Sequence, residues 1–520
     1  MSPTTVPAPS MVPGLRRNMV TICAMTATIM QALDTTIANV ALPYMQGTLS
    51  ASQDQINWVL TSYIVAAAIM TAPVGWIANR FGRKRIFILC SAGFTIASVL
   101  CGLAQDINQM VLFRLLQGVF GAALVPLSQA VMLDSYTLQE RAKAMSIWGM
   151  GVMMGPIMGP SLGAWLTETY SWHWVFFVNL PFGFITVLGL IIFMDETKKD
   201  LNLRFDWFGF TALAIGIGSL QVALDRGEQL GWLESNEIIA EFVVSAIGFY
   251  YFFAHSFTTS RPFIQFALFK DRNFVTGCIF MAVMGLVLYS TMALSSPYLQ
   301  NVIGYPIITA GVLLASRGCG TFVAMMIVGR LMRYIEARTL IVTGLGITAV
   351  SLFYMTGWTD QTGVPEIVTL SIFQGFGFGL VFVPLSTVSF LTLPNHLRTD
   401  GTSMLTLMRN VASSIGISVV IAQLTEGSRR VYAILNEHVN PFNHAMQMPD
   451  VAGQINMNTD HGRAMADVMI GLQAQIIAFS QDYQMVMMFI LCSIPLAIMI
   501  GSTKAALRKQ SAGPEHAVME

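Results

Sequence analysis

Apolar segments of about 20 residues recur along the whole length of this 520-residue chain. Such a segment is long enough to cross the hydrocarbon core of a bilayer as a single α-helix. A membrane β-barrel would show alternating strands of about 10 residues instead, so the continuous runs exclude that class. Only 11% of the residues are charged, against about 25% in soluble domains. The sequence therefore predicts an all-α polytopic membrane protein.

Fourteen of these segments are predicted to span the membrane, most of them joined by short loops. Their bounds are 18–42, 56–78, 85–104, 108–133, 143–166, 176–194, 207–224, 237–256, 274–295, 306–329, 339–357, 365–390, 402–423 and 484–503. If the N-terminus is cytoplasmic, 21 of the 28 Lys and Arg residues fall inside, 4 outside and 3 within spans. Inside loops of membrane proteins carry this excess of positive charge. We therefore expect both termini in the cytoplasm, with tails of residues 1–17 and 504–520.

The spans repeat at a nearly constant offset, which indicates an internal duplication. Gly75 and Gly329 lie 254 positions apart, and each precedes a basic loop. Further pairs at an offset of 254 or 257 are Pro43 and Pro297, Gln117 and Gln374, Arg141 and Arg398, and Gly159 and Gly416. We therefore predict two homologous six-helix halves, 18–194 and 273–503, the second including an outside loop at 424–483. Residues 195–272 would link the halves and add two spans.

Duplicated helical halves are a recurrent plan of secondary transporters, which bind their substrate between the halves near the membrane midplane. In the fifth span, glycines at every fourth position form one flat helix face that permits close approach of another helix. Prolines in the same span add flexure. We interpret this face as a moving interface, with static tight packing as the alternative. The residues concerned are Gly151, Gly155, Pro156, Gly159 and Pro160.

Several of these segments resemble signatures of the major facilitator superfamily. They are "LDTTIANVALP" (33–43), "RLLQGVFGA" (114–122), "GVMMGPIMGP" (151–160) and the loop from Gly75 to Arg85. The fourteen spans look like the family's drug:proton antiporter branch, and most of all like EmrB-type multidrug exporters. So do "WHWVFFVNLP" (172–181), "LDRGEQLGW" (224–232) and "LMRNVASSIGISV" (407–419). One departure is Pro160, which replaces the second Gly of the fifth-span signature.

The resemblance covers nearly the whole chain and implies a fold and a function. The implied fold is the major facilitator fold, with two six-helix halves plus two extra helices. The implied function is proton-driven export of hydrophobic drugs, uncouplers or fatty-acid-like compounds from a bacterial inner membrane. Such exporters work with a periplasmic adaptor and an outer-membrane channel. We expect no cofactor, because the proton gradient supplies the energy and the sequence has no GxxxxGK[ST] motif for direct use of ATP.

The loop after the second span resembles the family's cytoplasmic gating loop. The matching residues that we expect to take part in gating are Gly75, Arg80, Gly82 and Arg83. The family usually has an Asp where this chain has Asn79. The sequence therefore leaves open which charge takes over the role of that missing carboxylate.

Asp34 is the only charged residue between Met19 and Tyr44. An Asp at the centre of a membrane helix costs about 2.5–3.5 kcal/mol on insertion scales, so it should face the protein interior or a wet cavity. A carboxylate balanced between burial and a cationic neighbour can load and release a proton as access alternates. Arg114 is the expected neighbour, because the family places the first and fourth spans side by side. The alternatives are a static Asp34–Arg114 lock and an Asp bonded to helix-end amides.

Other polar residues within apolar spans are candidates to line a substrate cavity. Arg317 and Arg409 are intramembrane cations that could contact an anionic substrate or a carboxylate. Five amides complete the set: Gln31, Asn39, Gln117, Gln129 and Gln374. For most of these amides we expect hydrogen bonding between helices, with cavity lining as the alternative. The 34 Met and 33 Phe residues suit an adaptable hydrophobic cavity.

The outside loop at 424–483 is the only long soluble segment that the sequence predicts. Its stretch "VNPFNHAMQMPD" (439–450) predicts turns. After it, Met469, Leu472 and Phe479 fall on one helical face, together with Ile476. The loop could fold as a cap over the outer opening or dock the periplasmic adaptor, and the sequence leaves both open.

Other function classes find less support. A GxSxG string at 159–163 lies in a Gly- and Pro-rich span, not in the strand–turn–helix of a nucleophile elbow. With no HExxH motif either, we predict no enzyme and no metal site, and a net charge of zero gives no sign of a nucleic-acid partner. A proton-coupled uptake symporter and a non-transporting sensor or scaffold remain alternatives. The Gly-Pro signature of the fifth span favours antiport, and the polar signatures kept in the second half argue against a sensor.

Overall fold

The computed structural model describes residues 14–137, 139–197, 199–201, 203–259, 262–439 and 459–499, with the single residues 443 and 448. Within this part of the chain all regular structure is helical. The α-helices are α1 (Gly14–Thr48), α2 (Gln53–Thr71), α3 (Val74–Phe81), α4 (Arg83–Gly102), α5 (Ile107–Gly121), α6 (Leu124–Ser135), α7 (Arg141–Thr169), α8 (Trp174–Phe177), α9 (Asn179–Phe193), α10 (Trp207–Leu230), α11 (Asn236–Thr258), α12 (Arg272–Pro297), α13 (Ile307–Leu331), α14 (Ala337–Met355), α15 (Val364–Val388), α16 (Arg398–His438) and α18 (Asp460–Ser493). Short 3₁₀ or π segments are η1 (Trp232–Glu234), η2 (Phe266–Lys270), η3 (Tyr298–Val302), η4 (Asn395–Leu397) and η6 (Ile494–Met499).

Twelve to thirteen segments among the described residues are long and apolar enough to cross a membrane, and with α7 they are consistent with the fourteen predicted spans. Twelve are long and apolar enough when helices that run on into one another are joined. α2 and α3 form a thirteenth, bent by 56° at the break between them. α7 corresponds to the remaining predicted span; it has 29 residues and is therefore about 44 Å long. Its Gly and Pro residues lower its hydropathy, yet it packs inside the bundle between α1 and α13.

The same pairs of helices pack in the N-terminal half (α1–α9) and in the C-terminal half (α12–α18). α1 packs on α7 and α4 on α5, as α12 packs on α16 and α14 on α15. α9 lies against α1 and α4, as α18 lies against α12 and α14. The extra helices α10 and α11 pack on each other, and α10 also contacts α2 and α16. The additional pair is thereby attached to both halves.

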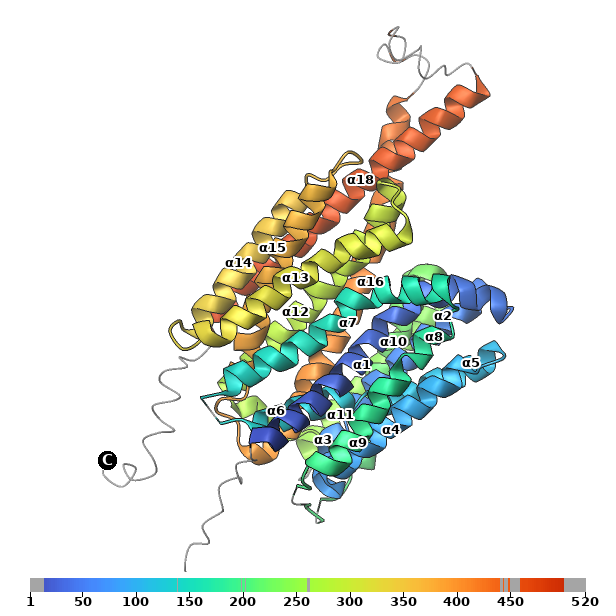
Figure 1. Cartoon of the computed structure of the whole chain (residues 1–520). Helices are drawn as coiled ribbons and strands as arrows, with labels where there is room; N and C mark the ends of the chain where they lie inside the picture. The colour runs from blue at the N-terminus through green and yellow to red at the C-terminus, as the bar shows by residue number, and fades with distance from the viewer. Residues whose placement is uncertain are drawn as a thin grey trace, which may run out of the picture.

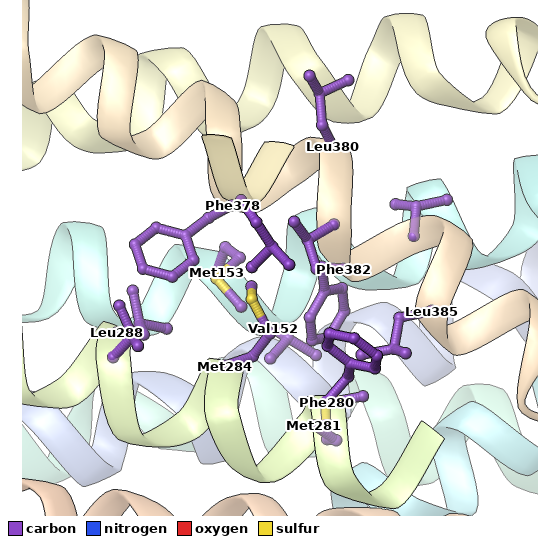
Figure 2. Close-up of a cluster of buried hydrophobic side chains, with 14 of the residues drawn as sticks. Val152, Met153, Phe280, Met281, Met284, Leu288, Phe378, Leu380, Phe382 and Leu385 are labelled. Atoms are coloured by element: carbon purple, nitrogen blue, oxygen red, sulfur yellow. The ribbon is translucent and has the colours of Figure 1, made fainter. Parts of the chain in front are cut away.

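Apolar side chains join the two halves. Figure 2 shows Val152 of α7 close to Met284 of α12, with Phe378 of α15 nearby in the same buried cluster. Trp148 of α7 stacks on Phe382 of α15, with 5.8 Å between ring centroids. Such an interface has few hydrogen bonds to break, which suits two halves that must change their relative position.

α16 and α18 extend far beyond the two spans predicted for them. α16 continues to His438 and α18 begins at Asp460, so both ends of the predicted outside loop are helical. Tyr432 donates a hydrogen bond to Asp467 and links the two helices. Figure 1 shows this helical hairpin projecting beyond the bundle at the end opposite to the start of α1. Most of the predicted turn segment 439–450 lies outside the described residues.

Candidate functional site

Asp34 of α1 forms an ion pair with Arg114 of α5 in the interior of the N-terminal half. Arg114 Nη1 lies 2.7 Å from Asp34 Oδ2. The side chain of Asp34 is 0% exposed and that of Arg114 is 1% exposed. The structure thus brings together the two residues that the sequence singled out. Their role in proton coupling stays a prediction, as does the alternative of a static lock.

Two amides complete the surroundings of the Asp34 carboxylate. Gln117, one helical turn after Arg114, donates a 2.8 Å hydrogen bond to Asp34 Oδ1 and accepts one of 2.8 Å from Arg114 Nη1. Asn179 at the start of α9 donates a 3.1 Å bond to the same Oδ1. Its amide also lies 3.0 Å from Ser98 Oγ. Both carboxylate oxygens are therefore paired, which is the condition for keeping a charge buried.

Arg114 is held on its other sides by a carbonyl and an aromatic ring. Its Nε donates a 3.0 Å hydrogen bond to the backbone oxygen of Val59. Its guanidinium carbon lies 4.3 Å from the centroid of the Tyr63 ring, a cation–π contact. The Tyr63 hydroxyl accepts a 3.3 Å hydrogen bond from Gln31. Tyr63 therefore stands between the ion pair and the space that Gln31 faces.

That space is a cavity of about 410 Å³ between the two halves. α1, α2 and α7 line one side, α12, α13 and α16 line the other, and α10 contributes one residue. Apolar surface dominates its walls, with a few polar groups, as in typical small-molecule sites. The polar and charged lining residues are Gln31, Thr35, Thr36, Asn39, Tyr63, Gln221, Tyr289, Ser296, Arg409, Asn410, Ser413 and Ser414.

Three of the predicted cavity residues line this space: Gln31, Asn39 and Arg409. Pro160 of α7 also reaches it. Arg409 is therefore a buried cation at the cavity wall, where a substrate can contact it.

The other four predicted cavity residues are buried away from the cavity. They are Gln117, Gln129, Arg317 and Gln374. Gln117 bonds the ion pair, which is the helix-bonding role left open above. Arg317 lies against Thr291 and Ser295 of α12. Gln129 and Gln374 keep amide atoms that have no hydrogen-bond partner in the described part of the chain.

The cavity is also lined by four residues that the sequence did not predict: Tyr63, Gln221, Tyr289 and Asn410. Gln221 and Asn410 are amides within apolar spans, the same signal that selected Gln31 and could have selected them. Gln221 donates a 2.8 Å hydrogen bond to Ser414 of α16. The extra helix α10 therefore helps to build the wall of the cavity.

The glycine face of α7 packs on α1 of the same half. A Cβ at Gly155 would overlap the backbone carbonyl of Ala32, and one at Gly159 would overlap the side chain of Thr36. Thr36 donates a 2.9 Å hydrogen bond to the Gly155 carbonyl. The other members of the set, Gly151 and Pro156, are also buried. The geometry at this face is tight packing within one half, and a movement along it stays a prediction.

At the predicted cytoplasmic end, residues of α3 contact the opposite half. Gly75 packs against the backbone of Asp400 on α16, where a Cβ would overlap it. Asn79 Nδ2 lies 3.4 Å from Asp400 Oδ2. Gly82 has φ +99°, a conformation that Gly adopts at no steric cost, and joins α3 to α4. A carboxylate of the other half, that of Asp400, therefore lies beside position 79.

A second carboxylate, Asp134 of α6, also joins the halves at this end. Arg398 of α16 lies 2.7 Å from Asp134 Oδ1, and Arg83 of α4 bonds the other oxygen. Arg80 keeps its Nη1 without a partner within the described ranges. The gating role of these residues stays a prediction.

Comparison with known proteins identifies relatives over most of the chain. The family model of the Major Facilitator Superfamily matches residues 24–417. The chain is 35% identical to the multidrug export protein EmrB of Escherichia coli (strain K12) over 439 residues, which are 83% of this chain and 84% of that protein. It is 32% identical to the fatty acid resistance protein FarB of Neisseria gonorrhoeae over 424 residues, 81% of this chain and 84% of that protein.

Two solved structures share the fold at low sequence identity. A bacterial homologue of the human lysosomal transporter Spinster, inward-facing and unoccupied, matches with TM-score 0.54 and 18% identity over 94% of this chain and 98% of that one. The human organic anion transporter MFSD10 (TETRAN) matches with TM-score 0.55 and 12% identity over 91% and 99%. These likenesses concern the fold alone, and they confirm the predicted all-helical architecture. The chain belongs to the Major Facilitator Superfamily, as a multi-pass membrane transporter, not an enzyme, related to multidrug and fatty-acid-resistance exporters.

Proposed function

We propose that this protein is a proton-driven antiporter that exports hydrophobic or amphipathic small molecules across a bacterial inner membrane. The observation that carries the proposal is the fully buried Asp34–Arg114 pair next to the cavity between the halves. Exchange requires one group that can hold a proton and one space that can hold a substrate. The names of the relatives, a multidrug exporter and a fatty acid resistance protein, support the substrate class and the direction.

Protonation of Asp34 would change the bonding of the buried network. Gln117 and Asn179 both donate to Oδ1, so Oδ2, which faces Arg114, is the oxygen that can take a proton with least rearrangement. A neutral carboxyl no longer attracts the guanidinium, and its O–H becomes a donor. Arg114 would then shift, and the shift would reach the Tyr63 ring that it contacts. Because Tyr63 lines the cavity, proton binding and substrate binding would be coupled.

The proton gradient supplies enough free energy for export. One proton that moves inward gains about 2.3 kcal/mol per 100 mV of membrane potential. Since about 1.4 kcal/mol corresponds to a factor of ten, one proton supports roughly a 40-fold gradient of a neutral substrate per 100 mV.

Arg409 gives the cavity a means to recognise anionic amphiphiles. Within the described residues its side chain donates one hydrogen bond, of 3.5 Å to the neighbouring Asn410, its Nε has no partner, and it forms no ion pair with a carboxylate. A guanidinium with unused donors can bind a carboxylate in a bidentate manner. Met292 and Leu314 offer apolar surface in the same cavity. A fatty-acid-like substrate would satisfy both features.

Accumulation assays in cells test this function. Cells with and without the protein are exposed to hydrophobic dyes and fatty acids, with the proton gradient intact or collapsed by an ionophore. An exporter lowers accumulation only while the gradient is intact. Higher accumulation in cells with the protein would instead identify an uptake symporter, and no difference for any compound would favour the sensor or scaffold.

We also infer a tripartite assembly with a periplasmic adaptor and an outer-membrane channel. With both termini cytoplasmic, the hairpin of α16 and α18 projects into the periplasm (Figure 1). Its exposed apolar side chains are Ile434, Met465, Val468 and Met469. Because the hairpin points away from the bundle, it suits docking better than capping the outer opening.

Deleting residues 440–460 tests the docking role of this hairpin. The shortened protein should insert into the membrane normally and recover less adaptor on co-purification. A replacement of the same residues by a Gly/Ser linker of equal length separates loss of the sequence from loss of length. Unchanged adaptor recovery from both variants would contradict the inference.

A further inference from the structure

The internal repeat gives the C-terminal half a second set of buried polar residues, Ser371, Gln374 and Asp482, which we call the second cluster and which match positions of the Asp34 network in the first half. Gln374 lies 257 positions after Gln117, the offset of the other matches between these spans. Asp482 lies 303 positions after Asn179, and a Phe precedes each of them by three residues. α18 packs on α12 and α14 as α9 packs on α1 and α4. Asp482 is therefore the counterpart of Asn179.

The polar atoms of this second cluster lack partners. Asp482 is 0% exposed, and neither of its carboxylate oxygens makes a hydrogen bond within the described residues. Both amide atoms of the buried Gln374 are unpaired in the same part of the chain, and so is the hydroxyl of Ser371. Ser371 stands 257 positions after Arg114. The position that holds the cation in the first half thus holds a neutral side chain in the second.

A cation of the C-terminal half, Arg317, is linked by a chain of hydroxyls to Tyr483, the neighbour of Asp482 on α18. Its Nη1 and Nη2 lie 3.3 and 3.5 Å from the hydroxyls of Thr291 and Ser295, and its Nε has no partner among the residues described. Ser295 Oγ is in turn 3.3 Å from the hydroxyl of Tyr483, the residue next to Asp482. Arg317 is thus linked to α18 at the residue next to Asp482, and within the described residues it forms no ion pair with Asp482.

The surroundings of Asp482 contain few other ionisable groups. Tyr483 on the same helix interacts electrostatically with Arg317 of α13, with Tyr298 of η3 and with Asp482. Within the described ranges, no charged side chain of α12, α14, α16 or η6, which also pack on α18, interacts with Asp482. Desolvation therefore acts on this carboxyl without a compensating cation.

We propose that Asp482 is a second proton-binding residue, which holds a proton in the present conformation and releases it when the C-terminal half rearranges and Arg317 reaches it. An ionised carboxylate buried without a partner is strongly disfavoured, whereas the protonated acid is neutral. Arg317 would then stabilise the ionised form, as Arg114 does for Asp34. The role of this proton in transport rests on the proposed antiport function, and it implies two protons per cycle.

Infrared spectroscopy of the purified full-length protein tests the proton directly. A protonated carboxyl absorbs at a carbonyl frequency at which a carboxylate does not. The wild type should show such a band at neutral pH that is lost in Asp482→Asn and kept in Asp34→Asn. Asp482→Glu should keep the band at a shifted frequency. If Asp482→Asn fails to fold, the spectrum of Asp482→Glu shows whether residue 482 is protonated. Identical spectra of the wild type and these Asp482 variants would overturn the proposal.

Transport in membrane vesicles tests the second proton, with ethidium as the probe. Two protons exchanged for one monovalent cation move one net charge inward, so a membrane potential speeds wild-type efflux. Exchange of one proton is electroneutral, so efflux by Asp482→Asn should respond to the pH gradient and not to the potential. Asp360→Asn, at an exposed carboxylate, is the control, and its efflux should still respond to the membrane potential.

A full response to the potential in Asp482→Asn would overturn the proposal of a second proton. If the wild type exchanges no protons for ethidium or any other compound, antiport fails, and the infrared result alone decides the proton site.

Discussion

Arg398, at the start of α16, donates a 2.7 Å hydrogen bond to Asp134 at the end of α6 and so joins the two halves. Arg83 bonds the other oxygen of the same carboxylate. Arg141 interacts electrostatically with both Asp134 and Arg398. One carboxylate therefore offsets three cations where the halves meet at the predicted cytoplasmic end. Because the Arg398–Asp134 bond crosses the halves, it exists only while this end is closed.

Asp134→Asn should therefore shift the protein toward a conformation that is open at this end. Hydrogen bonds to charged groups contribute about 1.5–3 kcal/mol each, so we expect the open population to rise by about tenfold or more relative to the closed one. Spin labels at the exposed positions Lys143 and Tyr334 would report a longer distance by pulsed electron paramagnetic resonance. Asp360→Asn, at an exposed carboxylate elsewhere, should leave the distance unchanged. An unaltered distance in Asp134→Asn would show that Asp134 does not hold this end closed.

Asn79→Asp, which introduces the carboxylate usual in the family, should weaken the closure. Asn79 lies 3.4 Å from Asp400, whose pKa burial raises to about 7. At alkaline pH, where both carboxylates are ionised, two like charges at about this distance repel by on the order of 1–4 kcal/mol near a protein surface. The same spin-label pair should therefore show a larger open fraction. The double variant Asn79→Asp/Asp400→Asn returns one carboxylate to the contact and should restore the wild-type distance. If the double variant stays as open as the single one, a carboxylate at position 79 opens this end by itself, and repulsion from Asp400 is not the cause.

The partner of a charged residue in the site was predictable, because an unpaired charge in lipid is costly. The partners of the neutral amides were less predictable. Asp34 required a cation within the membrane, and the sequence offers three such arginines, Arg114, Arg317 and Arg409. The family arrangement of spans then selected Arg114. Gln117 was chosen as a cavity residue, yet it bonds the ion pair, because its polarity within an apolar span does not tell which neighbour it meets.

Most of the spans were predictable from hydropathy, whereas the ends and contacts of the helices were not. Hydropathy marks where a segment leaves the lipid, but a helix ends only where its backbone hydrogen bonds end. α16 therefore continues through a polar segment as far as His438. The small-residue face of α7 was visible in the sequence, but its partner α1 is a property of the tertiary structure.

Gly155→Ala should destabilise the contact between α1 and α7. A Cβ at this position would overlap the backbone carbonyl of Ala32, two residues before Asp34, so the helices must separate. Overpacking of this kind typically costs about 1–3 kcal/mol, which should appear as faster thermal inactivation in detergent and weaker efflux. Gly346→Ala on α14 meets no atom within 4 Å and is the matched control. Equal inactivation rates for both variants would mean that α7 does not need its small residue at 155.

Arg409→Gln should reduce efflux of fatty acids and spare that of a cationic dye. The substitution keeps a polar side chain in the cavity and removes its charge. A lost charge-assisted hydrogen bond of about 1.5–3 kcal/mol corresponds to a rise in the apparent KM for a carboxylate substrate of about tenfold or more. Ethidium efflux is the internal control, because a cation gains nothing from Arg409. An equal loss for both compounds would assign Arg409 to the structure of the cavity and not to recognition.

Asp34→Asn should abolish gradient-driven efflux, down to the level of cells without the protein, because the amide cannot carry the proton. It also leaves Arg114 buried without its ion-pair partner, which costs about 3–5 kcal/mol and could reduce the amount of folded protein. The double variant Asp34→Asn/Arg114→Gln removes both charges and should restore insertion and thermal stability without restoring efflux. Ethidium efflux is measured at matched amounts of membrane protein, with an intact and a collapsed gradient.

The static-lock alternative makes the opposite prediction for the double variant, since a neutral pair of similar shape would lock the helices equally well and permit full efflux. Gradient-driven efflux by the double variant would therefore exclude Asp34 as a proton carrier, whereas its absence in a stable protein leaves proton loading as the function of the pair.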